Sequence, residues 1–352
     1  MSVSGRFIRS FILLILAMLL AVTGIVVLFD PFYVYHAPLP GLKKVLSDKE
    51  YQCVGSLRHF DYNSLVAGSS VTENNNTRWY DELFSVRTEK AVRSYGATAD
   101  LMYLLDVAHE SHQLKYVFYN IDPTSLAADP VTTYESTGCP VYLYDRNPLN
   151  DYSYWLNKDV LLEKIPYQIV RSLSGYDEGT GYNWWESKDF SASGALSHYY
   201  RREEILPMQP EDALSGNLDA NISLLVNETA SHPETMYYYF FPPYSMLWWD
   251  NEYRTGELDA VLSNELKCME ALLALDNARV FFFQGDEEII TDLDLYMDAL
   301  HFKPEINHLM AERMATGEGE VLPGEAGETV AGFKDLILRI EEEILPGVLE
   351  GR

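Results

Sequence analysis

The chain begins with a long apolar segment. Residues Ser10–Phe29 are uncharged and largely aliphatic, over about the length that a helix needs to span a bilayer. Arg6 and Arg9 precede the segment and Asp30 follows it, which predicts a membrane anchor with the N-terminus in the cytoplasm. A cleaved signal peptide is the alternative, but its apolar region is normally shorter, and no small-residue cleavage motif precedes Asp30. A buried core helix is the weakest of the three interpretations.

Apolar runs of strand length follow the anchor and alternate with stretches of helical spacing. The runs are SLVAG (Ser64–Gly68), KAVRSY (Lys90–Tyr95), KYVFYNID (Lys115–Asp122), TMYYYFFPPYS (Thr235–Ser245) and ARVFFFQG (Ala278–Gly285). Helical spacing recurs over residues 101–108, 258–275 and 330–340. Nearly continuous apolar strands between helices predict a parallel sheet of about five strands covered on both faces, a three-layer α/β/α sandwich.

This pattern predicts three parts. Residues 1–30 are the cytoplasmic stub and transmembrane anchor, residues 31–61 are a linker, and residues 62–352 are the α/β domain. Within that domain, Ala127–Pro233 breaks the alternation and is rich in Asn, Tyr, Gly and Pro. It is either an insertion that covers one end of the sheet or a small separate domain.

The net charge of −27 argues against nucleic acid and anionic lipid surfaces as partners, because phosphate binding requires clustered Lys and Arg. The three cysteines cannot all pair with one another, so the fold is not expected to depend on disulfides. The 25 Tyr and 6 Trp supply ring faces of the kind that suits sugars, although most must serve ordinary packing.

Ser69 and Ser70 follow the first apolar run directly. In a parallel sheet this position is the carboxyl end of a strand, where ligands bind. Gly68 permits a tight turn, and the backbone N–H groups of a following helix would stabilise an oxyanion beside a serine nucleophile. Small residues that merely suit a strand–helix turn are the alternative interpretation.

A serine nucleophile needs a base and a group that orients the base. Two Asp-x-x-His sequences are present, DVAH (Asp106–His109) and DALH (Asp298–His301). The first falls within a predicted helix, away from the strand ends, and predicts a surface or half-buried histidine. The second follows the last predicted strand, in a loop that can reach the same sheet edge as Ser70.

These residues resemble the SGNH/GDSL hydrolase superfamily, in particular its membrane-anchored bacterial branch of cell-envelope proteins. The resemblance covers Asp61–Leu126 and Thr235–Met310. The family block Gly-Asp-Ser reads Gly68-Ser69-Ser70, which implies that Ser70 is the nucleophile. Gly96 in SYGAT fits the glycine that shares the oxyanion hole with the nucleophile's own N–H. The resemblance also implies that His301 takes the Ser70 proton while Asp298 holds the imidazole and stabilises its charged form.

Two positions depart from the family pattern. Ser69 stands in place of the Asp before the nucleophile. The third block, usually Gly-x-Asn-Asp, reads YNIDPTSL, with Asn120 at the glycine position and Asp122 at the Asn position. A carboxylate cannot stabilise an oxyanion unless it is protonated. Either Asn120 completes the hole from a shifted register, or only Ser70 and Gly96 donate; capping of the turn is a further role for both residues.

Aromatic and histidine-rich segments suggest further contacts. Tyr244 and Trp248, in FFPPYSMLWW, are expected to line the substrate site, with core packing as the alternative. Trp184 and Trp185 either face the same site or pack the insertion. HESH (His109–His112) lacks the zinc signature His-Glu-x-x-His, so neither a metal nor a cofactor is expected.

The resemblance implies an extracytoplasmic serine esterase or O-acyltransferase. Its expected partners are acyl esters of a cell-envelope glycan or related polymer, and the membrane through the N-terminal helix. A non-catalytic envelope assembly or binding protein with the same fold is the competing hypothesis. The set Ser70, His301 and Asp298 favours the enzyme, whereas Asp122 favours the alternative.

Overall fold

The computed structural model describes residues 3–350 and divides the chain into two compact units. The first unit contains residues 1–60 and 134–181, and the second contains residues 61–133 and 182–352. These boundaries differ from the predicted ones. The predicted linker contains a helix and belongs to the first unit, and the predicted insertion is shared between the two units.

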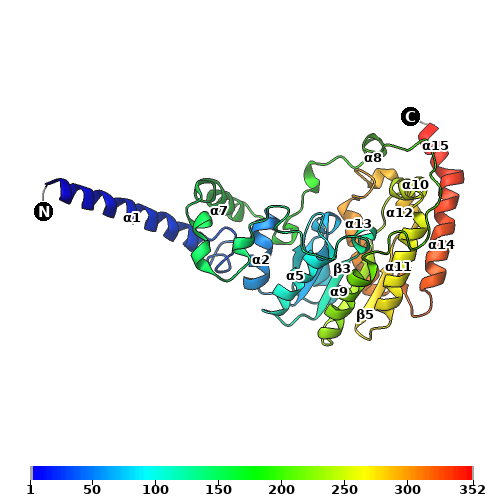
Figure 1. Ribbon diagram of the computed structural model, residues 1–352, viewed down its shortest axis with the longest axis horizontal. Coiled ribbons are helices and arrows are strands. Elements are labelled where there is room, and N and C mark those ends of the chain that lie inside the picture. The colour runs from blue at the N-terminus through cyan, green and yellow to red at the C-terminus, as the bar shows by residue number, and fades with distance from the viewer. Residues whose placement is uncertain (1–2, 351–352) are drawn as a thin grey trace. The chain divides into compact units, whose positions relative to one another are not determined.

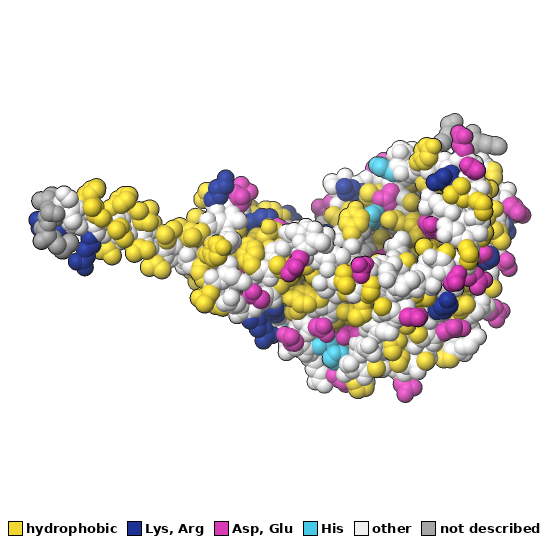
Figure 2. Space-filling model, in the orientation of Figure 1, with side chains coloured by type: hydrophobic (Ala, Val, Ile, Leu, Met, Phe, Trp, Pro, Cys, Tyr) yellow, Lys and Arg dark blue, Asp and Glu magenta, His cyan; other side chains and the backbone are white. Residues whose placement is uncertain are grey.

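The first unit opens with helix α1 (Val3–Phe29), which contains the predicted anchor (Figure 1). Within it, Ser4–Phe29 is long and apolar enough to cross a membrane, and 6% of its most apolar window is buried. Hydrophobic side chains cover most of the face of this helix that Figure 2 shows, and basic side chains lie near its N-terminal end. An all-round apolar surface without a buried stripe is typical of a helix whose partner is lipid.

The chain after α1 is ordered by the carboxylate of Asp30. It accepts hydrogen bonds from the backbone N–H groups of Val34 (3.1 Å), Tyr35 (2.7 Å) and His36 (3.1 Å), and from the Tyr154 hydroxyl (2.8 Å). The other elements of this unit are α2 (Lys49–His59), η2 (Val141–Leu143), η3 (Pro148–Asn150), α6 (Tyr152–Trp155), η4 (Val160–Lys164), α7 (Ile165–Leu173) and η5 (Glu178–Thr180). The sequence pattern did not predict that these segments pack together, because contacts such as Tyr154 to Asp30 join residues more than a hundred positions apart.

The second unit contains a six-stranded, mostly parallel sheet in the order β2-β1-β3-β4-β5-β6. The strands are β1 (Ser64–Gly68), β2 (Thr88–Val92), β3 (Tyr116–Asn120), β4 (Met236–Phe241), β5 (Ala278–Phe282) and β6 (Glu320–Val321). The first five are parallel and overlap the five predicted runs, although β2 begins two residues before its run, whereas β6 pairs antiparallel with β5. Every residue of β1 and β2 is buried.

Helices connect these strands, and further helices follow the last strand (Figure 1). They are α3 (Ser70–Glu73), α4 (Thr77–Phe84), α5 (Thr98–His109), η1 (Pro123–Leu126), η6 (Trp185–Ser187), α8 (Ala192–Ser197), α9 (Leu218–Ser231), α10 (Met246–Thr255), α11 (Leu258–Leu273), α12 (Glu287–Thr291), η7 (Leu293–Leu295), α13 (Pro304–Thr316), α14 (Ala326–Arg339), η8 (Ile340–Ile344) and α15 (Leu345–Glu350). Helix α9 lies between α5 and α11, and α14 lies beside α11. The end of the predicted insertion is therefore a regular connecting helix.

The strand order determines where a ligand would bind. From β1 the chain moves to β2 on one side and then returns to β3 on the other. Ligands of open α/β sheets bind at such a reversal, outside the carboxyl ends of the strands. Ser70 follows β1 and Asn120 ends β3, so both lie at this point.

Candidate active site

Ser70 lies at the turn between β1 and α3. Ser69 has an extended backbone and precedes the helix, and Ser70 is its first residue and is half-buried. A Cβ atom on Gly68 would lie 2.2 Å from Thr72 Oγ1 and 2.7 Å from Asn120 Cβ. Only glycine fits there, so the turn brings Ser70 close to the end of β3.

Asp298 and His301 lie in a loop between η7 and α13. Tyr296 and Phe302 form an isolated antiparallel bridge across the loop, and the Tyr296 hydroxyl donates to the carbonyl of Pro243 at 2.7 Å. Ser245 Oγ donates to the carbonyl of Ala299 at 2.9 Å. These bonds attach the loop to the carboxyl end of β4, at the same sheet edge as Ser70.

The three predicted side chains form a hydrogen-bonded row. Ser70 Oγ lies 2.8 Å from His301 Nε2, and His301 Nδ1 lies 2.7 Å from Asp298 Oδ2. The other oxygen of Asp298 accepts the backbone N–H groups of Leu300 and His301, both at 2.8 Å. Burial opposes ionisation of Asp298, but the hydrogen bonds and charge of His301 together hold its pKa below the usual value. A charged Asp298 therefore holds the Nδ1–H tautomer, which leaves Nε2 to accept the Ser70 proton.

Two buried asparagines connect the Ser70 turn to the helix after His301. Asn307 of α13 donates to the carbonyl of Val71 at 3.3 Å, and its Oδ1 accepts from Asn75 Nδ2 at 3.2 Å. Asn75 in turn accepts the Tyr80 hydroxyl at 2.9 Å. Both amides are at most 1% exposed. The separation of Ser70 and His301 is thus fixed by side chains that the motifs do not include.

The end of β3 carries a second buried network. Asn120 Nδ2 donates to Asp122 Oδ1 at 2.8 Å, and the same carboxylate accepts the Tyr244 and Ser69 hydroxyls. Burial raises the pKa of Asp122, although these donors and His301 oppose the shift. A carboxylate only accepts, so the bond to Asp122 identifies the amide atom beside it as nitrogen and leaves a second N–H on that nitrogen. Asp122 thereby takes the role of an orienting acceptor for Asn120.

Gly96 lies in the turn after β2. A Cβ atom at this position would lie 2.6 Å from Arg93 Cγ, so the turn requires glycine. The Gly96 N–H already donates to the carbonyl of Arg93 at 3.1 Å. The structure therefore places Gly96 in a closed turn, and its N–H reaches an oxyanion only if that turn opens or shares the hydrogen.

Tyr244 and Trp248, which were expected to line the substrate site, are buried. Tyr244 and Trp248 are 3% and 8% exposed, they pack against each other, and the Tyr244 hydroxyl is bonded to Asp122. Both rings are therefore largely buried in this structure. Trp184 lies at the site instead: its Nε1 donates to the carbonyl of Ser70 at 3.2 Å, and its ring meets the His301 ring edge-on at 5.1 Å. Its neighbour Trp185 is half-buried in η6.

The segment that carries Trp184 is held in place by further bonds. The Trp184 backbone N–H donates to Asn74 Oδ1 at 3.1 Å, and Lys90 Nζ donates to Asn183 Oδ1 at 2.6 Å. Asn74 comes directly after α3. The aromatic residue beside His301 thus arrives from the predicted insertion, at a position that no local motif marks.

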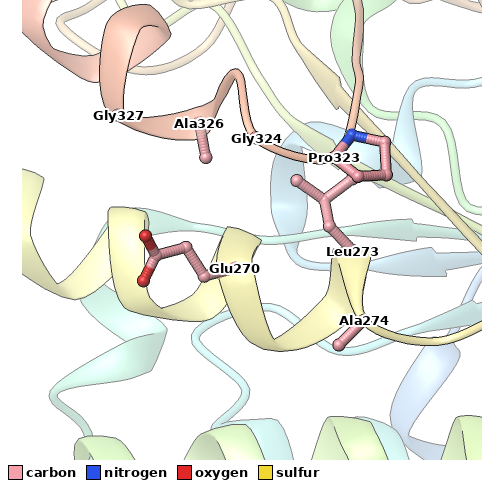
Figure 3. A pocket seen from close by; sticks show the side chains of 7 residues that line it. All are labelled: Glu270, Leu273, Ala274, Pro323, Gly324, Ala326 and Gly327. Atoms are coloured by element: carbon pink, nitrogen blue, oxygen red, sulfur yellow. The ribbon is translucent and has the colours of Figure 1, made fainter.

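The other Asp-x-x-His sequence lies elsewhere. His109 ends α5 and is within 3.2 Å of the hydroxyl of Tyr237, near the start of β4. It therefore lies at the amino ends of the strands, opposite Ser70. A hollow between α11 and the loop before α14 also lies apart from the candidate site (Figure 3). Its lining includes Glu270, Leu273 and Pro323 and shares no residue with the Ser70 site.

A scan against protein-family models finds no match to this chain, and a search of curated proteins finds no significant match.

Proposed function

We propose that the protein is a membrane-anchored serine esterase or O-acyltransferase of the SGNH/GDSL type. The observation that carries the proposal is the row from Ser70 Oγ to His301 Nε2 (2.8 Å) and from His301 Nδ1 to Asp298 (2.7 Å). This is the arrangement of an activated nucleophile, a base and an orienting acid.

The reaction has two halves at these residues. His301 Nε2 takes the proton as Ser70 Oγ attacks the ester carbonyl, and Asp298 stabilises the resulting imidazolium. The oxyanion accepts the Ser70 N–H and the second N–H of Asn120, whose amide Asp122 orients. His301 then returns the proton to the leaving alcohol. Water or a second hydroxyl attacks the acyl-serine in the reverse sense, giving hydrolysis or transfer.

The fold that supports this chemistry is a three-layer α/β/α sandwich. The connection from β1 through α4 to β2 runs in one direction across the sheet, whereas the connections through α5, α9 and α11 run in the other. Right-handed crossovers in opposite directions put their helices on opposite faces. The complete burial of β1 and β2 agrees with a sheet covered on both sides.

The proposed location is outside the cytoplasmic membrane, with the N-terminus inside. Arg6 and Arg9 before the apolar helix and Asp30 after it support this orientation. Cys139 is half-buried, whereas Cys53 and Cys268 are buried. A membrane-impermeant maleimide added to intact cells should therefore label Cys139 selectively. If Cys139 is labelled only after lysis, the opposite membrane orientation is indicated.

The proposed substrate is an acyl ester on a cell-envelope glycan or related polymer. Two aromatic side chains offer surfaces that suit sugar rings. Trp184 packs against His301. Tyr95, the residue before Gly96, is 95% exposed. Both extend from segments at the carboxyl edge of the sheet.

The direct test uses a serine-reactive fluorophosphonate on the purified chain. Ser70 should be labelled, Ser70→Ala should abolish labelling, and Ser69→Ala should retain it. The competing function is a non-catalytic assembly or binding protein, favoured by the closed Gly96 turn and by Asp122. It predicts no labelling of a folded chain at any serine, and that result would reject the esterase.

A further inference from the structure

A cluster of metal-binding side chains lies at the amino edge of the sheet, away from Ser70. His109 ends α5, Glu228 lies in α9, and His232 follows that helix. One ligand atom from each residue lies within 4.8 Å of the others. From these residues we propose a binding site for a single zinc-class divalent transition-metal ion, independent of the esterase proposed above.

The distances suit a zinc ion after a small adjustment. Zinc–ligand bonds of about 2.0–2.1 Å at tetrahedral angles place ligand atoms about 3.3 Å apart. His109 Nε2 lies 3.2 Å from Glu228 Oε1, and His232 Nε2 lies 4.0 Å from Glu228 Oε2. The two imidazole rings stack in parallel with centroids 3.5 Å apart. Binding therefore requires the His232 ring to turn out of this stack so that both nitrogens face one ion.

The chemistry of the donor set favours a transition metal over magnesium or calcium. Two imidazoles and one carboxylate form a three-ligand set that suits zinc, with a fourth position open to water. His232 is the most exposed of the three, with 24% of its side chain accessible, so the open position faces solvent. Magnesium and calcium instead prefer sites built from oxygen ligands.

The surroundings hold the carboxylate and add negative charge. Glu228 is 6% exposed and accepts the Tyr237 hydroxyl at 2.8 Å. Burial and the Glu228 charge raise the pKa of Tyr237, so its hydroxyl keeps the proton that it donates. Asp106, one turn before His109, interacts electrostatically with Glu228, His109 and His232. A divalent cation would compensate the negative charge of the buried Glu228 and of the exposed Asp106 near it.

The spacing of residues along the sequence could not predict this set of three ligands. Glu228 and His232 are an i,i+4 pair, whereas His109 comes from a helix more than a hundred residues earlier. Adjacent packing of α5 and α9 joins the two halves. A bound ion would fasten these helices to each other at the edge opposite the Ser70 site.

The test measures zinc affinity on the full chain in detergent, purified with a tag that contains no histidine. After chelator treatment and dialysis, zinc is titrated in competition with a chromophoric chelator, and cobalt is added separately to record its absorption bands. The wild type should bind a single zinc ion per chain and give the cobalt spectrum of a four-coordinate site. His232→Ala and Glu228→Gln should each weaken zinc binding by at least about tenfold.

His308→Ala is the matched control. His308 and Glu312 repeat the i,i+4 spacing at 3.7 Å on α13, but both are exposed and belong to no three-ligand group among residues 3–350. Its zinc affinity should equal that of the wild type. His232→Ala should also keep the wild-type rate on a small ester, because the cluster lies opposite Ser70.

The proposal is overturned if the wild type does not bind a single zinc ion per chain, or if His232→Ala retains the wild-type zinc affinity. An equal loss in His308→Ala would also reject it. Circular dichroism checks folding; if Glu228→Gln unfolds, the His232→Ala variant, whose side chain is only half-buried, decides the result.

Discussion

Replacing Asn120 with Asp tests how the oxyanion is stabilised. The change is nearly isosteric: one amide nitrogen becomes an oxygen, 2.8 Å from Asp122 Oδ1. Two carboxyl groups then face each other in a buried position. The fold should tolerate the shape, whereas the site should lose the second N–H of Asn120, which is the proposed oxyanion donor.

The protonation state of this pair follows from two magnitudes. Two charges 2.8 Å apart repel by about 6 kcal/mol at an effective dielectric constant of 20. Keeping a carboxyl group of ordinary pKa protonated at pH 7 costs about 4 kcal/mol. The pair should therefore hold one proton, and the free energy of unfolding at pH 7 should fall by up to about 4 kcal/mol. This loss should shrink as pH falls and vanish below about pH 4, where the carboxyl group is increasingly protonated in the unfolded chain as well as in the folded one.

The shared proton replaces the hydrogen bond to Asp122 but not the second N–H. We expect kcat for p-nitrophenyl acetate, per folded molecule, to fall about 10²–10³-fold with KM nearly unchanged. Asn221→Asp is the matched control: Asn221 is fully buried and donates to the carbonyls of Leu126 and Ala128, away from the catalytic row. It should lose stability but keep kcat. Folded Asn120→Asp with a wild-type kcat would show that Asn120 is not an oxyanion donor.

Three further outcomes are expected. Ser70→Ala should abolish hydrolysis of a small acetyl ester, whereas Ser69→Ala should keep most of it. Equal losses in the two variants would show that the motif Gly68-Ser69-Ser70 has been assigned in the wrong register. Trp184→Ala should raise KM for a glycan ester by up to about tenfold while Trp184→Phe does not, and an unchanged KM would remove the ring from the substrate site. Burial raises the pKa of Glu265 to about 8, so between pH 4.5 and 8 the folded chain holds a proton that the unfolded chain releases. The free energy of unfolding of the wild type then falls as pH rises through this range. Measured by urea unfolding, the Glu265→Gln variant should gain up to about 5 kcal/mol in this free energy at pH 8 and nothing at pH 4. An equal gain at both pH values would contradict the raised pKa of Glu265.

The local pattern determined the elements of the sheet and its candidate chemistry. The five runs overlap the five parallel strands, and four of these strands are nearly continuous apolar sequence, as buried strands require. Strand β2 reads Thr-Glu-Lys-Ala-Val and begins two residues before its predicted run, so the pattern located it only in part. The helices over residues 258–275 and 330–340 also follow from spacing alone. Ser70, Asp298 and His301 could be selected because each lies beside a strand end or in a short motif.

Tertiary structure decided what no short segment contains. The fold of residues 31–60 with residues 134–181, the link from Asn307 to the Ser70 turn, and Trp184 beside His301 all join distant parts of the chain. Asp122 illustrates the reason: its position in the sequence suggested a damaged oxyanion hole, but its carboxylate orients Asn120 through a contact made at the folded strand end. Periodicity and motifs depend on neighbours in sequence, whereas the partners of a buried polar group are chosen by packing.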